Sequence, residues 1–169
     1  MARKGAWPRY VAACLRYGAS RGLRATVRPM VVHARIGSVA GCEVFKVEPG
    51  LYLVELRGHI SRQIVAEMNA LVLADRRGSE PIAAVFVTTP GFSGYDPTFR
   101  SEAGSVALDG TVHIGIVTPS RVLRMVTATM AIGLRLARNI VMVPYGSVDE
   151  AIDGARDALA KAARVQRRA

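Results

Sequence analysis

Cysteines and long apolar runs are scarce in this sequence. Cys14 and Cys42 are the two cysteines, and they do not have the C-x-x-C spacing of metal or redox sites. Such sparse cysteine predicts a reducing compartment, and we expect the cytoplasm. The longest apolar run, residues 125–134, is bounded by Arg124 and Arg135 and is about half of the roughly 20 residues that span a bilayer. Because arginines also interrupt the apolar region near the N-terminus, the sequence predicts neither a secretory signal nor a membrane span.

Signatures of catalysis and of metal binding are also missing. The sequence contains no P-loop, no G-x-G-x-x-G and no pair of carboxylates at helical spacing from a histidine. Residues 91–95 (GFSGY) begin like the G-x-S-x-G nucleophile elbow but lack its last glycine. His113 lies inside a predicted strand and is expected to be a core or edge histidine, while His59 is expected to face solvent, with a ligand or base role as the alternative. We therefore predict a non-enzymatic protein without a cofactor or a metal.

Acidic residues are absent from residues 1–42, which hold eight arginine and lysine residues. Residues 161–169 hold four basic residues and no acid, whereas residues 43–160 hold eleven basic residues and all thirteen acids. The net charge of +10 therefore resides in the two terminal segments, and the central part is nearly neutral. This distribution makes the basic composition weak support for a nucleic-acid partner, and we do not expect one.

Residues 1–41 form a basic arm in which apolar residues are scattered among arginines and glycines. Three interpretations of this arm stay open: a basic tail that touches nucleic acid or an anionic lipid surface, an organelle-type presequence, or an extension that precedes a start at Met30. We expect residues 42–165 to form one domain, because 169 residues with 50% hydrophobic residues suffice for a core of ordinary size. Residues 166–169 are expected to be a short basic tail.

The first half of this domain predicts a hairpin, a helix and a buried strand. Residues 43–47 and 51–57 are two strand-like runs separated by the proline and glycine of a tight turn. Ser61 is placed to cap a helix whose apolar residues recur at a 3.6 period and which ends near Gly78. Residues 82–87 are uniformly apolar, as expected of a central strand covered on both faces.

A glycine-rich loop is predicted over residues 88–97. It leads into a second helix that is capped by Asp96 and has Pro97 at its first position, where the missing N–H costs nothing. The apolar residues of this helix continue to Ala107.

Two further strand and helix pairs complete the domain. Residues 111–117 predict a strand, and residues 140–143 predict the last one. Ser147 and Glu150 form a capping box at the start of the final helix, because the serine accepts a free backbone N–H and the glutamate reaches back to the cap. The helix between these two strands has an apolar face that consists of Val122, Leu123, Val126, Met130 and Leu134.

The predicted order of elements is β-β-α-β-α-β-α-β-α. Parallel strands joined through a helix cross over right-handedly, so the loops that follow these strands gather at one edge of the sheet. Ligands and partners of open α/β sheets bind at this edge. The predicted fold class is therefore α/β, with one sheet covered by helices.

Four short segments give the chain a resemblance to a known family: residues 57–61 (RGHIS), 94–97 (GYDP), 121–125 (RVLRM) and 148–151 (VDEA). Over residues 43–163 the chain resembles the STAS domains of bacterial anti-sigma-factor antagonists, in particular the SpoIIAA-like group, which is distantly related to Sec14-type lipid-binding domains. The resemblance implies a single domain with a mixed sheet of about five strands covered by about four helices.

The resemblance implies a non-enzymatic regulatory or protein-interaction module that docks a protein partner, such as a regulatory kinase or an anti-sigma-like factor. In this family the partner meets the loop after the third strand and the second helix, and phosphorylation there switches binding. The matching segment is residues 91–100, in which GFSGYDP replaces the family's Asp-Ser-Ser-Gly run. Ser93 is the nearest hydroxyl and hence the candidate phosphorylation site. The candidate edge for a partner or ligand consists of Ser93, Tyr95, Asp96, Arg100, Arg121 and Arg124.

Anion binding at the same edge is the alternative function. Arg121 and Arg124 lie three residues apart on the first turn of a predicted helix, near backbone N–H groups that can meet a phosphate, and Arg100 approaches the same edge. A small anionic ligand or a lipid headgroup fits these donors, whereas the competing interpretation is that the arginines are ordinary exposed side chains. Association of the basic termini with a membrane surface also stays open, as does a homodimer through Val122 and Met125.

Overall fold

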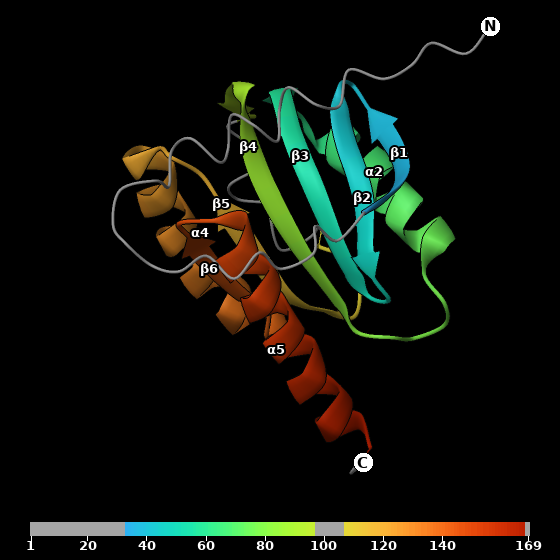
Figure 1. The fold of residues 1–169 in the computed structure, drawn as a ribbon. Helices are drawn as coiled ribbons and strands as arrows, with labels where there is room; N and C mark the ends of the chain where they lie inside the picture. Colours follow the sequence, from blue (N-terminus) through green and yellow to red (C-terminus); the bar gives the residue numbers. More distant parts are fainter. Residues whose placement is uncertain (1–32, 97–106, 168–169) are drawn as a thin grey trace, which may run out of the picture. The chain divides into compact units, whose positions relative to one another are not determined.

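The computed structural model describes residues 33–96 and 107–167, which form a mixed α/β fold (Figure 1). All of these residues belong to one compact unit of the chain, Val31–Ala169. Its described strands are β1 (Ala34–Val39), β2 (Cys42–Glu48), β3 (Leu51–Ile60), β4 (Ile82–Tyr95), β5 (Thr111–Val117) and β6 (Val141–Tyr145). Its described helices are α2 (Arg62–Asp75), α4 (Arg121–Arg138) and α5 (Val148–Gln166).

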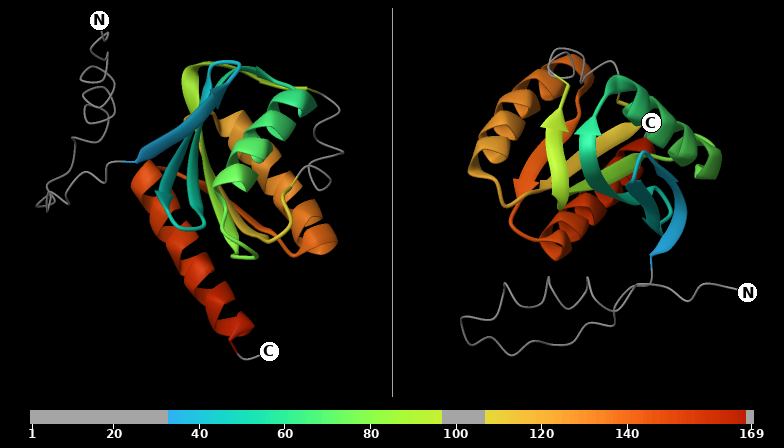
Figure 2. Two further views of the ribbon diagram at one scale, coloured as in Figure 1. Left: turned by 90° about the vertical axis from the view of Figure 1, so that its right-hand side faces the viewer. Right: turned by 90° about the horizontal axis from the view of Figure 1, so that it is seen from above.

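The described strands form one six-stranded sheet in which the strand order follows the chain order. β1, β2 and β3 pair antiparallel, whereas β3, β4, β5 and β6 are parallel. Helices α2 and α4 cover one face of the sheet and α5 covers the other (Figure 2). The predicted α/β class is confirmed, with six strands in place of about five.

The two hairpins at the start of the sheet differ in how well the sequence predicts them. β2 and β3 pair across Pro49 and Gly50, as predicted. β1 was not predicted, because it lies inside residues 1–41, the segment interpreted as a basic arm. Its turn to β2 is formed by Ala40 and Gly41, which both have positive φ angles, of 48° and 83°. Hairpin turns of this kind usually carry asparagine or glycine at the first position, so an alanine there gives a weak sequence signal.

Strand β4 corrects the prediction of a loop over residues 88–97. The strand continues to Tyr95, and its second half pairs with β3 through Gly58 and Phe92 and through Ile60 and Tyr95. Pairing between β4 and β5 ends at Val87, so the second half of β4 has one neighbour, β3, among the described strands. A proline is tolerated in such an edge segment because its missing N–H removes no hydrogen bond that the sheet needs there.

Each of the three described helices has a serine as its N-cap residue. Ser61 accepts a hydrogen bond from Ile64 N at 3.4 Å, and Ser147 accepts one from Glu150 N at 3.3 Å, which confirms both predicted caps. Ser120 caps α4 in the same way. The predicted second helix, from Asp96 to Ala107, falls largely outside the described residues. Within residues 33–96 and 107–167, none of the helices has the length and the apolar character to cross a membrane.

Candidate functional site

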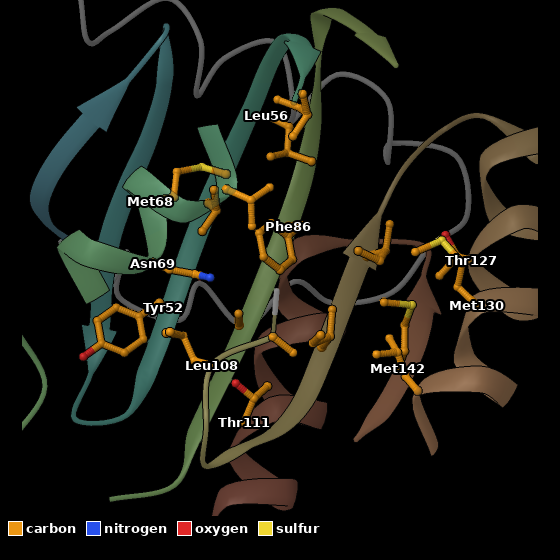
Figure 3. Close-up of a pocket in the computed structure, with 18 of the residues that line it drawn as sticks. Tyr52, Leu56, Met68, Asn69, Phe86, Leu108, Thr111, Thr127, Met130 and Met142 are labelled. Atoms are coloured by element: carbon orange, nitrogen blue, oxygen red, sulfur yellow. The ribbon is translucent and has the colours of Figure 1, made fainter. Parts of the chain in front are cut away.

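An apolar cavity of about 110 Å³ lies between the sheet and the two helices α2 and α4. Figure 3 shows Met68 and Asn69 of α2 on one side of it, Thr127 and Met130 of α4 on the other, and Phe86 of β4 between them. The residues of the sheet that line it are Tyr52, Val54, Leu56, Ile60, Ile82, Ala84, Phe86, Tyr95, Thr111, Ile114, Ile116 and Met142. The remaining described lining residues are Val65, Met68, Asn69, Val72, Ala107, Leu108, Leu123, Val126, Thr127, Met130 and Leu134.

The lining follows from the periodicity of the elements. In β4, alternate residues face opposite sides of the sheet, so Ala84 and Phe86 face the cavity while Ala83 and Val85 pack towards α5. In α4, Leu123, Val126, Met130 and Leu134 recur at helical spacing and form the wall opposite α2.

The cavity is polar at a few points, and two of its hydroxyls already donate hydrogen bonds within the protein. Tyr52 Oη donates a hydrogen bond to Asp75 Oδ2 at 3.0 Å, and Thr127 Oγ1 donates one to Leu123 O at 2.8 Å. None of the described lining residues is charged. Burial raises the pKa of Tyr95 to about 12 and also raises that of Tyr52, so both phenols are neutral at physiological pH.

Such a site favours apolar molecules. A charged ligand would lose its hydration without gaining a partner of opposite charge from the described lining, whereas an apolar ligand gains free energy in proportion to the area it buries. An engineered protein cavity of about 150 Å³ lined by aliphatic and aromatic residues binds benzene. The cavity of this protein, at about 110 Å³, is smaller but of the same order, so a ligand inside it is no larger than a small aromatic ring or a short alkyl group.

The predicted edge residues occupy different environments. Tyr95 is half-buried, lines the cavity and makes an edge-to-face contact with Phe92, with 5.1 Å between the ring centroids. Ser93 lies two residues before Tyr95 in β4 but is exposed. The Asp96 backbone N donates a hydrogen bond to Ile60 O at 3.0 Å, which holds the end of β4 against β3. Arg100 lies outside the described residues.

Arg121 and Arg124 are exposed at the start of α4, after β5. Because β4 and β5 are parallel, their C-terminal ends lie at the same edge of the sheet. The arginines after β5 therefore lie at the same edge as Ser93 near the end of β4. The structure therefore places Ser93, Arg121 and Arg124 at one edge and directs Tyr95 to the cavity.

The two histidines of the predicted domain differ in exposure. His113 is 3% exposed, which confirms the predicted core position, and its Nε2 lies 3.3 Å from Tyr145 Oη. Burial lowers the pKa of His113 below its ordinary value. His59 is exposed, as predicted, but it belongs to strand β3 and not to a turn. In residues 33–96 and 107–167, no three His, Cys, Asp or Glu side chains gather in a way that could hold a metal ion.

The helical period of α4 was visible in the sequence, but its division into an inner and an outer face was not. Leu123, Val126, Met130 and Leu134 face the cavity, as their spacing indicates. Val122 was predicted on the same apolar face but is 70% exposed. The cavity itself gave no sequence signal, because its walls come from strands and helices far apart in the chain.

The fold and the cavity define a small mixed α/β domain with an apolar interior site. No protein-family model and no curated protein matches the chain. Among solved structures, the chain is similar to the crystal structure of an uncharacterized protein of the DUF3478 family with a SpoIIAA-like fold from Shewanella loihica PV-4. The two chains are 10% identical, with a TM-score of 0.49, and the alignment covers 76% of this chain and 98% of that one.

Proposed function

We propose that this protein is a non-enzymatic binding module that holds a small apolar molecule in the cavity between the sheet, α2 and α4. The observation that carries the proposal is the cavity itself, with apolar walls and no charged side chain among its described lining residues. The ligand class is an uncharged aromatic or short-chain aliphatic molecule, or the apolar end of a longer one.

Two residues in the middle of the sheet support this proposal. Ala84 and Phe86 belong to a strand that pairs on both sides, with β3 and with β5, yet both are only half-buried. Their neighbours Ala83 and Val85, which face α5, have no exposed surface. A central strand is normally covered on both faces. The described residues leave part of the cavity-side face accessible, which supports a ligand there.

The test is a cavity-filling variant, Ala84→Phe, compared with Ala66→Phe, which adds the same side chain to an exposed position of α2. We expect benzene, indole and n-hexanol to raise the melting temperature of the wild-type chain and of Ala66→Phe, because a ligand that binds the folded state stabilises it by mass action. Ala84→Phe should lose this response. Ala84→Leu, with a smaller side chain, serves if the phenylalanine variant does not fold. Equal responses in the filled variant and the wild type, or no response in the wild type, would contradict the proposal.

We also propose that the sheet edge at Ser93 docks a protein partner, such as a regulatory kinase or an anti-sigma-like factor, and that phosphorylation of Ser93 releases it. The supporting observation is that Ser93 is exposed at the same edge of the sheet as the exposed Arg121 and Arg124. A phosphate on Ser93 would add nearly two negative charges to that edge. Phosphopeptide analysis of the protein from its native host should find the modification on Ser93. Ser93→Asp should lose a partner that Ser93→Ala and the exposed control Ser79→Asp retain, and equal binding by all three variants would refute this proposal.

A further inference from the structure

Helix α4 carries a second apolar face that points away from the cavity. Val122 is 70% exposed, Met125 73%, Ile132 65% and Leu136 83%. Thr129, which is also exposed, lies between them, so the five residues follow one another at intervals of three, four, three and four. We call these five residues the outer stripe. It runs for about 21 Å along the helix, at 1.5 Å per residue.

The stripe has the dimensions of a helix-packing seam. At 100° per residue its five side chains fall within an arc of about 80°, which is narrower than the apolar face of a helix that packs on a globular core. Intervals of three and four residues are those of the a and d positions of a coiled coil. The opposite face of α4 already packs on the sheet and the cavity through Leu123 and Leu134, so the domain folds without burying the stripe.

Thr129, the polar member of the stripe, is suited to burial. Its Oγ1 donates a hydrogen bond to Met125 O at 3.2 Å within the same helix. A hydroxyl that is already bonded loses little when a partner excludes water from it. The stripe can therefore be covered along its whole length without leaving a hydroxyl donor unsatisfied.

The charges of α4 have one sign. The helix contains Arg121, Arg124, Arg135 and Arg138 and no acidic residue. Two of these arginines stand in the first turn, where the helix dipole disfavours a positive charge. By contrast, α5 begins with Asp149 and Glu150. Among the described residues, Arg138 in the last turn of α4 pairs with Asp109 at 3.3 Å, which offsets part of the charge at that end. The N-terminal end, with Arg121 and Arg124, is therefore the strongly positive end of the helix.

From the apolar stripe and the arginines on the same helix we infer that the outer stripe binds an amphipathic helix of a partner protein. The apolar ridge of that helix is flanked by aspartate or glutamate. A second copy of α4 fits less well, because it would bring four more arginines and no carboxylate. A lipid surface also fits less well, because the stripe is narrow and none of its members is aromatic. This inference does not depend on whether the cavity is occupied.

The experiment titrates the full chain with a designed helical peptide that has leucine at its a and d positions and glutamate at the flanking positions. A peptide of the same pattern with lysine in place of glutamate is the charge control. Leu136→Glu and Ile132→Glu place a charge in the stripe, and Leu73→Glu, at a 51% exposed position of α2, is the matched control. All three positions are exposed, so we expect the variants to fold.

We expect the acidic peptide to bind, the basic peptide to bind at least about tenfold more weakly, and rising salt to weaken binding. Leu136→Glu and Ile132→Glu should each lower the affinity about tenfold or more, and Leu73→Glu should leave it unchanged. Equal binding of the two peptides, or equal loss in Leu73→Glu, would overturn the inference. If the full chain sediments as a dimer and Leu136→Glu sediments as a monomer, the inference is overturned in favour of a second copy of the chain. The inference would also be overturned, in favour of a membrane, if the full chain bound phosphatidylglycerol vesicles but neither peptide and Leu136→Glu abolished the vesicle binding.

Discussion

His113 is the described residue whose burial most directly makes the stability of the fold depend on pH. Its side chain is 3% exposed, and burial holds its pKa below the ordinary value because the imidazolium form would lose its hydration. The unfolded chain therefore binds a proton at a higher pH than the folded chain does. The free energy of unfolding should then fall as the pH is lowered from about 6.5 towards the folded pKa, with a slope of at most about 1.4 kcal/mol per pH unit from this residue.

Denaturant unfolding at several pH values checks this prediction. His113→Gln should flatten the dependence below pH 6.5. Some dependence should persist in His113→Gln, because burial and the nearby Arg156 also lower the pKa of His33. An unchanged slope in His113→Gln would show that His113 does not make this contribution.

Gly154 is a second residue whose role the structure explains. A Cβ atom there would overlap the Tyr145 hydroxyl and lie 2.8 Å from Tyr145 Cζ. Glycine inside a helix normally costs about 0.5–1 kcal/mol relative to alanine, but the close approach of Tyr145 reverses the expectation. Gly154→Ala should lower the free energy of unfolding by about 1–3 kcal/mol. Urea unfolding of Gly154→Ala and of Gly154→Ala with Tyr145→Leu tests this, because the smaller leucine should recover part of the loss. A gain in stability from Gly154→Ala alone would contradict this packing of Tyr145 against the helix.

At the scale of single elements, the positive charge at the start of α4 lowers the stability of the helix and is available to an acidic partner. Arg121 stands in the first turn after the Ser120 cap, where a positive charge opposes the helix dipole. Arg121→Glu should therefore raise the stability of the free protein by about 0.3–1 kcal/mol and weaken its binding to the acidic peptide. Arg121→Gln should give an intermediate result in both measurements. Lower stability in Arg121→Glu, measured by urea unfolding, would mean that the arginine has a stabilising contact that outweighs the dipole.

The elements also show where prediction from the sequence succeeds. Ser61 and Ser147 were predicted as caps and are caps, because capping depends on residues three positions apart. The second half of β4 was predicted as a loop, because Pro90 and its neighbouring glycines are typical turn residues. Their tolerance in a strand depends on the absence of a β5 neighbour beyond Val87, which is a property of the sheet and not of the local sequence.

At the scale of the whole molecule, the fold class was predictable and the cavity was not. The order of strands and helices, together with the rule on crossovers, leads to a sheet covered by helices. The cavity depends on how closely α2 and α4 approach the same face of the sheet, and its walls include Met68, Phe86 and Met130 from three separate elements. Packing distances of this kind do not follow from periodicity. The basic arm stays an open prediction, because residues 1–32 lie outside the described part of the chain.

The methyl groups of the methionines give the most direct test of the apolar binding site. Met68, Met130 and Met142 line the cavity, whereas Met125 is 73% exposed in the outer stripe and serves as an internal control. The full chain, labelled at its methionine methyl groups, is titrated with benzene while NMR spectra are recorded. We predict that the resonances of the three lining methionines shift and saturate together while that of Met125 stays in place. A titration in which Met125 shifts as much as the lining methionines, or in which none of the four shifts, would contradict the proposed binding site.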